Sequence, residues 1–165
     1  MPLVDALLPE FDREMSATRK VLERVPEDRF DWKPHAKSFS IGALATHLAN
    51  LPTWGTETLT KPEIDLPGNP SLTAFPSKAE LMAAFDRNMA AMRAALSGKT
   101  DAELLAMWTL KRSGKTLFSM PKTAVLRSFV LSHVIHHRGQ LSVYLRLLDV
   151  PVPSIYGPSA DEPAF

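Results

Sequence analysis

The sequence predicts an all-α protein, a four-helix bundle with a long crossover connection and a small hairpin-like insert before the last helix. Four long segments carry apolar residues at spacings of three and four, which is typical of amphipathic helices. Residues 61–76 contain four prolines and one glycine, and this stretch is long enough to connect helices that are not adjacent. Residues 108–118 alternate in character around a Ser-Gly pair, which indicates a hairpin-like excursion.

The first two helices are predicted in the N-terminal third of the chain. Apolar spacing predicts a helix over about residues 4–23, and a proline-containing loop covers residues 26–39. Ser40 is a suitable N-cap for the second helix. Pro52 lies inside the apolar pattern of this helix, so we expect a kink there or an end near Asn50.

The third helix is predicted over residues 78–96. Ser77 and Glu80 have the spacing of a capping box, and Gly98 is a stop signal. A short helical turn over residues 101–107 then leads to the hairpin.

The last helix is predicted over about residues 122–148, opened by Pro121. After Val150 the tail contains four further prolines. We expect this tail to be extended and to form a disordered end.

The composition is that of an ordinary globular protein, with 45% apolar residues, 22% charged residues and a formal net charge of +1. We expect a single domain, residues 1–165. Nucleic-acid and membrane partners are not expected, because the chain has no basic stripe and no apolar run near the roughly 20 residues that cross a bilayer. The chain has no cysteine, which excludes disulfides and cysteine-ligated metals. With an N-terminus unlike a signal peptide, this predicts a cytoplasmic protein.

Three of the five histidines lie within five consecutive residues of the last helix: His133, His136 and His137. His133 and His137 are four residues apart, so they leave the same face of the helix. On a uniform helical wheel, Gln140 and all three histidines share this face with six apolar residues: Leu126, Phe129, Val130, Tyr144, Leu147 and Leu148. They are either core histidines that pair locally or ligands of a transition metal. A buried imidazole without a partner costs on the order of 1–3 kcal/mol, and the spacing suits a divalent ion, so we favour a metal site.

A metal site needs a further ligand from another element, and only His35 and His47 remain. His35 lies in a proline-rich loop, whereas His47 lies on the second helix at the border of its apolar face. The predicted metal ligands are therefore His47, His133 and His137. Three imidazoles leave a coordination position open, as in catalytic sites. Trp54, about two helical turns after His47, is expected to border the site.

The remaining polar residues of the last helix suggest supporting roles. No carboxylate follows His133, so the site differs from the His-Glu-x-x-His site of metalloproteases. His136 is a candidate catalytic residue, as a hydrogen-bonding group or proton carrier that Gln140 could orient. Tyr144 is a second candidate, as a proton donor, with packing as its alternative role. Arg138 points off this face and is expected to form a surface or interhelix ion pair.

Six segments carry a family resemblance: residues 30–35, 41–48, 133–141, 143–146, 151–153 and 156–162. The most specific is His-His-Arg-Gly-Gln at residues 136–140. Together the segments resemble the DinB-like (DinB/YfiT) family of metalloenzymes over nearly the whole chain. The resemblance implies a four-helix bundle with a long crossover connection, commonly a homodimer. It also implies a zinc or nickel ion held by His47, His133 and His137.

The same family includes thiol-dependent transferases and isomerases that use mycothiol, bacillithiol or glutathione, and damage-inducible proteins without an assigned reaction. We therefore expect a metal-dependent enzyme, either a thiol-dependent S-transferase or a hydrolase, that acts on a small-molecule substrate. A low-molecular-weight thiol is the expected partner. The alternative is a non-catalytic metal-binding or structural helical bundle, related to stress or damage responses.

Overall fold

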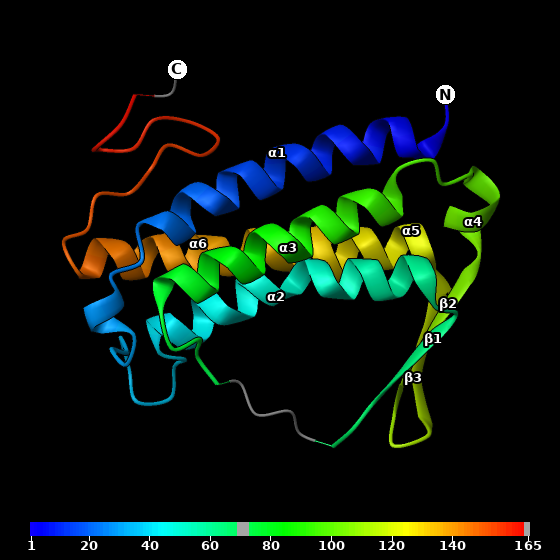
Figure 1. The fold of residues 1–165 in the computed structure, drawn as a ribbon, viewed down its shortest axis with the longest axis horizontal. Coiled ribbons are helices and arrows are strands. Elements are labelled where there is room, and N and C mark those ends of the chain that lie inside the picture. The colour runs from blue at the N-terminus through cyan, green and yellow to red at the C-terminus, as the bar shows by residue number, and fades with distance from the viewer. Residues whose placement is uncertain (69–72, 164–165) are drawn as a thin grey trace.

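Four long helical segments dominate the structure, a computed structural model that describes residues 1–68 and 73–163. They are α1 (Leu3–Glu23), α2 (Ile41–Thr60), α3 (Lys78–Leu96) and the last helix, which ends as α6 (Ser132–Leu147) (Figure 1). α1 and α2 each pack against both α3 and α6, and their buried apolar side chains form one large core between them. The predicted bounds of the first and third helices are confirmed to within a residue or two.

The connection between α2 and α3 crosses the length of the molecule. In Figure 1, α2 and α3 run in the same direction, and α1 and α6 run in the opposite direction. Two neighbouring helices can be parallel only if the chain between them returns along the bundle, as expected for a long crossover connection. Shorter helical elements in the described residues include η1 (Glu27–Arg29), α4 (Asp101–Leu105) and α5 (Lys122–Val125), the first part of the last helix.

The chain is not purely all-α, which corrects the predicted fold class. A three-stranded sheet at one end of the bundle contains β1 (Glu63–Leu66), β2 (Met107–Arg112) and β3 (Lys115–Pro121), in that order (Figure 1). β2 and β3 are the predicted hairpin. Its turn, Ser113 and Gly114, has φ angles of 50° and 78°, as a tight hairpin turn requires.

β1 was not expected, because it lies in the segment predicted to be the crossover connection. It pairs in parallel with β2, from Glu63 opposite Thr109 to Leu66 opposite Arg112. The two strands are more than forty residues apart in the chain, and the pairing satisfies backbone groups that no local pattern assigns to a partner.

α2 begins at the predicted N-cap, where the Ser40 hydroxyl accepts a hydrogen bond from the Ala43 N–H at 3.2 Å. The carbonyl oxygens of Trp32 and Phe30 accept from the N–H groups of Ile41 and Gly42. The loop before α2 thus satisfies N–H groups that a helix end leaves unpaired.

Of the two alternatives expected at Pro52, the end of the second helix near Asn50 is wrong, since α2 continues through Pro52 to Thr60. Pro52 and its neighbour Leu51 are both buried in the bundle. Tertiary packing of this segment compensates for the hydrogen bond that proline cannot donate.

Replacing Gly42 with alanine is expected to lower the free energy of unfolding by about 1–3 kcal/mol, the usual cost of overpacking. A Cβ at this position would lie 2.9 Å from both the side chain and the backbone oxygen of Phe30, and a backbone atom cannot easily move away. Gly139 on α6 is the matched control, because a Cβ there meets nothing within 4 Å. Gly139→Ala should stabilise the protein by about 0.5–1 kcal/mol. Urea unfolding of both variants checks the two signs, and equal effects would contradict the steric argument.

The last helix is interrupted by a π-helical segment, η2 (Leu126–Leu131), between α5 and α6. A π turn holds more residues than the about 3.6 of an α turn, so it changes which residues face the core. The uniform helical wheel was therefore wrong after this segment. The buried residues of α6 are Val134, Arg138, Leu141 and Leu145, whereas His136, Gln140 and Leu147 are exposed.

The C-terminal tail, which the structure describes to residue 163, docks on the bundle, and this corrects the expectation of a disordered end. Asp161 accepts hydrogen bonds from Arg146 at 2.5 Å and from the Val152 N–H at 2.8 Å. Glu162 forms an ion pair with Arg24 at 2.5 Å, and Val152 packs against the main core. The ion pair with Arg24 joins the tail to a residue near the start of the chain, so the composition of the tail did not reveal it.

A buried polar cluster joins the tail to the bundle. Arg138 is only 1% exposed and donates to the Glu14 carboxylate at 2.6 Å, to the Glu14 carbonyl at 3.0 Å and to Thr18 at 3.2 Å. The Tyr156 hydroxyl donates to the same carboxylate at 2.6 Å and also contacts Arg138. The interhelix ion pair expected for Arg138 is thus present, but in the core.

Within residues 1–68 and 73–163, none of the helices combines the length and the apolar character needed to span a membrane.

Candidate metal site

Three histidines from two helices converge at the contact between α2 and α6. The Nε2 atoms of His47 and His133 are 3.2 Å apart, and those of His133 and His137 are 2.8 Å apart. The ring centroids of His47 and His137 are 4.8 Å apart. His47 lies in the middle of α2 beside the buried Leu44 and Leu48, which hold that face of the helix against the core. The structure therefore brings together the three histidines that spacing had grouped.

Burial keeps these imidazoles neutral. Desolvation, followed by the neighbouring charges of His137 and His133, lowers the pKa of His47 from 6.5 to about 4. Desolvation is also the main cause that lowers the pKa values of His133 and His137. A neutral imidazole keeps the nitrogen lone pair that a metal ion needs.

Hydrogen bonds at the far side of two rings raise the pKa values of His133 and His137 against the effect of burial, and they fix which ring nitrogen carries the proton. His137 Nδ1 lies 2.7 Å from Gln140 Oε1, an acceptor, so the proton belongs on Nδ1 and the lone pair on Nε2. The backbone of Phe129, within the π-helical segment, hydrogen-bonds to His133. Gln140 thus orients His137 and not His136, which corrects the predicted pairing.

The donor set fits a divalent ion. One nitrogen from each of the three histidines lies within 4.8 Å of the others. Nitrogens bound tetrahedrally to zinc at about 2.0–2.1 Å lie about 3.3 Å apart, close to the 3.2 Å that separates the Nε2 atoms of His47 and His133. Three neutral nitrogen donors suit a divalent transition-metal ion better than magnesium or calcium, which prefer oxygen.

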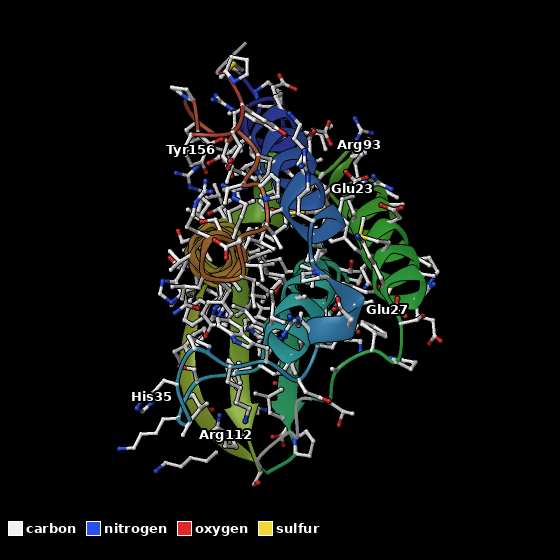
Figure 2. The ribbon with its side chains drawn as sticks, turned by 90° about the vertical axis from the view of Figure 1, so that its left-hand side faces the viewer. Glu23, Glu27, His35, Arg93, Arg112 and Tyr156 are labelled. Carbon is white, nitrogen blue, oxygen red and sulfur yellow. The ribbon has the colours of Figure 1, made fainter. Side chains whose placement is uncertain are left out.

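The two candidate catalytic residues lie outside this group. His136 is exposed, although its ring centroid is 4.9 Å from that of His137. Tyr144 is half-buried and packs edge-to-face on Trp32, with ring centroids 5.7 Å apart. His35 is exposed at the periphery, away from the helices (Figure 2).

A cavity of about 250 Å³ opens beside the histidines, lined by His47, Trp54, Leu66, Leu110, Arg112, Phe129 and His133. Trp54 borders it as expected. Sequence reasoning missed the residues that β1 and β2 contribute. The one available signal was the alternation along β2, where Trp108, Leu110 and Arg112 share a face.

Metal-free protein is expected to lose stability as pH falls from about 7 to about 4. Unfolded His47 titrates near its ordinary pKa of about 6.5, whereas in the folded chain its pKa is about 4. Between these values the unfolded state binds more protons, so the free energy of unfolding rises with pH. His133 and His137 act in the same direction because their pKa values are lowered too. Urea unfolding with a chelator, across this pH range, measures the effect.

The control for this prediction is His47→Gln, which removes one of the titrating rings. Its free energy of unfolding should depend less on pH between about 6.5 and 4 than that of the parent, because carboxylates contribute equally to both. If the free energy of unfolding of the two proteins depends on pH identically, the lowered pKa of His47 does not cause the loss of stability.

The fold and the site define a class: a mostly helical protein in which histidines from two packed helices form a candidate metal site. The chain belongs to the DinB family, whose sequence model matches residues 1–164.

Three relatives are similar to this chain over most of its length. The uncharacterized protein YrdA of Bacillus subtilis (strain 168) is 27% identical over 167 residues, which cover 96% of this chain and 91% of YrdA. A DinB-like protein from Bacillus cereus ATCC 10987 has a TM-score of 0.71 at 21% identity and covers 92% of this chain and 97% of its own. The DinB-like protein YjoA from Bacillus subtilis has a TM-score of 0.68 at 18% identity, with 90% and 96% covered. The two structures support the fold.

Proposed function

We propose that this protein is a divalent-metal-dependent enzyme whose ion is held by His47, His133 and His137. One observation carries the proposal: three neutral imidazoles converge beside an apolar cavity that two of them line. A site with three protein ligands keeps a position for substrate, whereas a structural site is closed by four. Zinc and nickel are the ions that this donor set favours.

The chemistry that such an ion supplies when bound is Lewis acidity, which lowers the pKa of a coordinated water or thiol. The chain itself contributes orientation and exclusion of water. Gln140 holds the His137 ring, and Trp54 and Phe129 form apolar walls beside the ligands. His136, exposed beside His137, is suited to carry protons between the site and solvent, and Tyr144 is the second candidate proton donor.

We favour thiol-dependent S-transfer with a low-molecular-weight thiol as the partner, and hydrolysis is the alternative reaction. A second copy of this chain is a further proposed partner. Ile135, Val143 and Leu147 are exposed apolar side chains along α6. Sedimentation velocity of the parent and of Val143→Glu tests the dimer, which the charge should dissociate.

Metal titration followed by reactivity assays tests the function. Purified protein should bind one zinc or nickel ion per chain, measured by competition with a coloured chelator. The loaded protein should then accelerate reaction of a small thiol with an electrophile, or hydrolysis of an activated ester, and chelation should abolish this. Stoichiometric binding that raises the melting temperature without any such acceleration would favour the non-catalytic metal-binding bundle. Failure to bind either metal would overturn the proposal.

A further inference from the structure

The cavity beside the histidines has one feature that metal binding does not use, a cation at its edge. Apart from His47 and His133, its walls are the apolar side chains of Trp54, Leu66, Leu110 and Phe129, together with Arg112. At about 250 Å³ the space is slightly below the usual range for small-molecule sites, so it suits only a compact ligand.

The strand geometry directs Arg112 to this cavity. Residues at alternate positions of a strand share a face, so Arg112 lies on the same face of β2 as the buried Trp108 and Leu110. Trp108 and Leu110 pack against side chains of the helices, whereas Arg112, the next residue on this face, carries a charge. Figure 2 shows Arg112 on the opposite side of α6 from Tyr156, so it is remote from the buried cluster of the tail.

Lys111 is paired, whereas Arg112 and Lys115, which lie opposite each other on β2 and β3, form no ion pair among the described residues. Lys111, on the other face of β2, lies 2.7 Å from the Glu63 carboxylate, and Asp65 accepts a hydrogen bond from the Gly114 N–H at 2.8 Å. In the part of the chain that the structure describes, residues 1–68 and 73–163, no ion pair involves Arg112. A guanidinium without a carboxylate beside an apolar pocket gives the cavity a net positive charge, which favours an anionic ligand.

We propose that the cavity binds a small organic carboxylate, with its carboxylate on Arg112 and its compact apolar body against Trp54, Leu66, Leu110 and Phe129. A ligand seated this way has its other end toward His47 and His133. That the carboxylate is the substrate of the enzyme rests on the proposed function. Arg112 would then be a residue that determines substrate specificity.

Calorimetric titration with 3-phenylpropionate and its uncharged analogue 3-phenylpropanamide tests the proposal. The acid should bind about tenfold more tightly than the amide, the effect of one hydrogen-bonded charge pair. Arg112→Gln should weaken binding of the acid about tenfold and leave binding of the amide unchanged. Lys111→Gln is the matched control, because that lysine is adjacent in sequence but faces away, and its affinities should equal those of the parent. Arg112→Lys keeps the charge and should retain part of the preference.

Equal affinities for acid and amide, or an Arg112→Gln variant that binds the acid as tightly as the parent, would overturn the proposal. If Arg112→Gln binds the acid as tightly as the parent, the carboxylate of the ligand binds to the metal or to another group. Titrations of chelated and zinc-loaded protein separate this inference from the proposed function. A charge preference that depends on Arg112 in chelated protein supports the inference even if zinc fails to bind, and normal zinc binding without that preference refutes the inference alone.

Discussion

His133→Ala is expected to lower the affinity of the protein for zinc by more than about 100-fold. The His133 Nε2 atom lies 3.2 Å from that of His47 and 2.8 Å from that of His137, so it is the central donor of the three. Removing a residue that only orients a ligand already costs about 10–100-fold, and loss of the ligand itself should cost more. Competition with a coloured chelator, backed by elemental analysis of the dialysed protein, measures the affinity.

His35→Ala is the control, because His35 is an exposed loop histidine whose ring accepts a hydrogen bond from the Lys37 N–H. It should bind zinc as the parent does. Zinc at about 100 times its dissociation constant should stabilise the parent by about 2.7 kcal/mol and stabilise His133→Ala far less. Circular dichroism in the presence of chelator verifies that the variant is folded. Full zinc binding by folded His133→Ala would show that the ligand assignment is wrong.

Arg138→Ala is expected to lower the free energy of unfolding by about 3–5 kcal/mol, the cost of breaking a buried ion pair by removing one partner. The Glu14 carboxylate would keep the Tyr156 hydroxyl but lose its charged partner inside the bundle, and it too is almost fully buried. Two further hydrogen bonds from Arg138, to the Glu14 carbonyl and Thr18, would be lost as well. Urea unfolding at about pH 7 measures the change.

The matched control is Arg146→Ala, two turns further along the same helix. Arg146 pairs with Asp161 at the surface, with the arginine side chain 48% exposed, so its loss should cost less than about 1 kcal/mol. Tyr156→Phe should fall between the two, since it removes one hydroxyl from the buried cluster. If Arg138→Ala and Arg146→Ala cost the same, the buried cluster does not stabilise the fold as the geometry indicates.

The long helices could be predicted because their signals are local. The Ser40 and Ser77 caps lie within three residues of the N–H groups they satisfy, and the apolar spacing of α1 and α3 repeats every turn. The hairpin likewise has its turn residues next to its strands. Such signals need no information about distant parts of the chain.

The candidate metal ligands were predictable for a related reason. The spacing of four residues places His133 and His137 on one helix face wherever the helix lies, and His47 and His35 were the remaining choices. The geometry of one helix thus identified His133 and His137 as a pair, and only two histidines remained as the third candidate ligand. That His47 meets this pair was decided by the packing of α2 on α6.

The sequence by itself determined the positions of the long helices, the hairpin and the two histidines on one face of the last helix. Only the tertiary structure decided that β1 joins β2, that the tail docks through Asp161 and Tyr156, and that Arg112 reaches the cavity. It also decided that Arg138 is buried, because the π-helical segment rotated the core face of α6. The physical reason is range: capping and periodicity act within about one turn of helix, whereas strand pairing, ion pairing and burial depend on residues that only folding brings together.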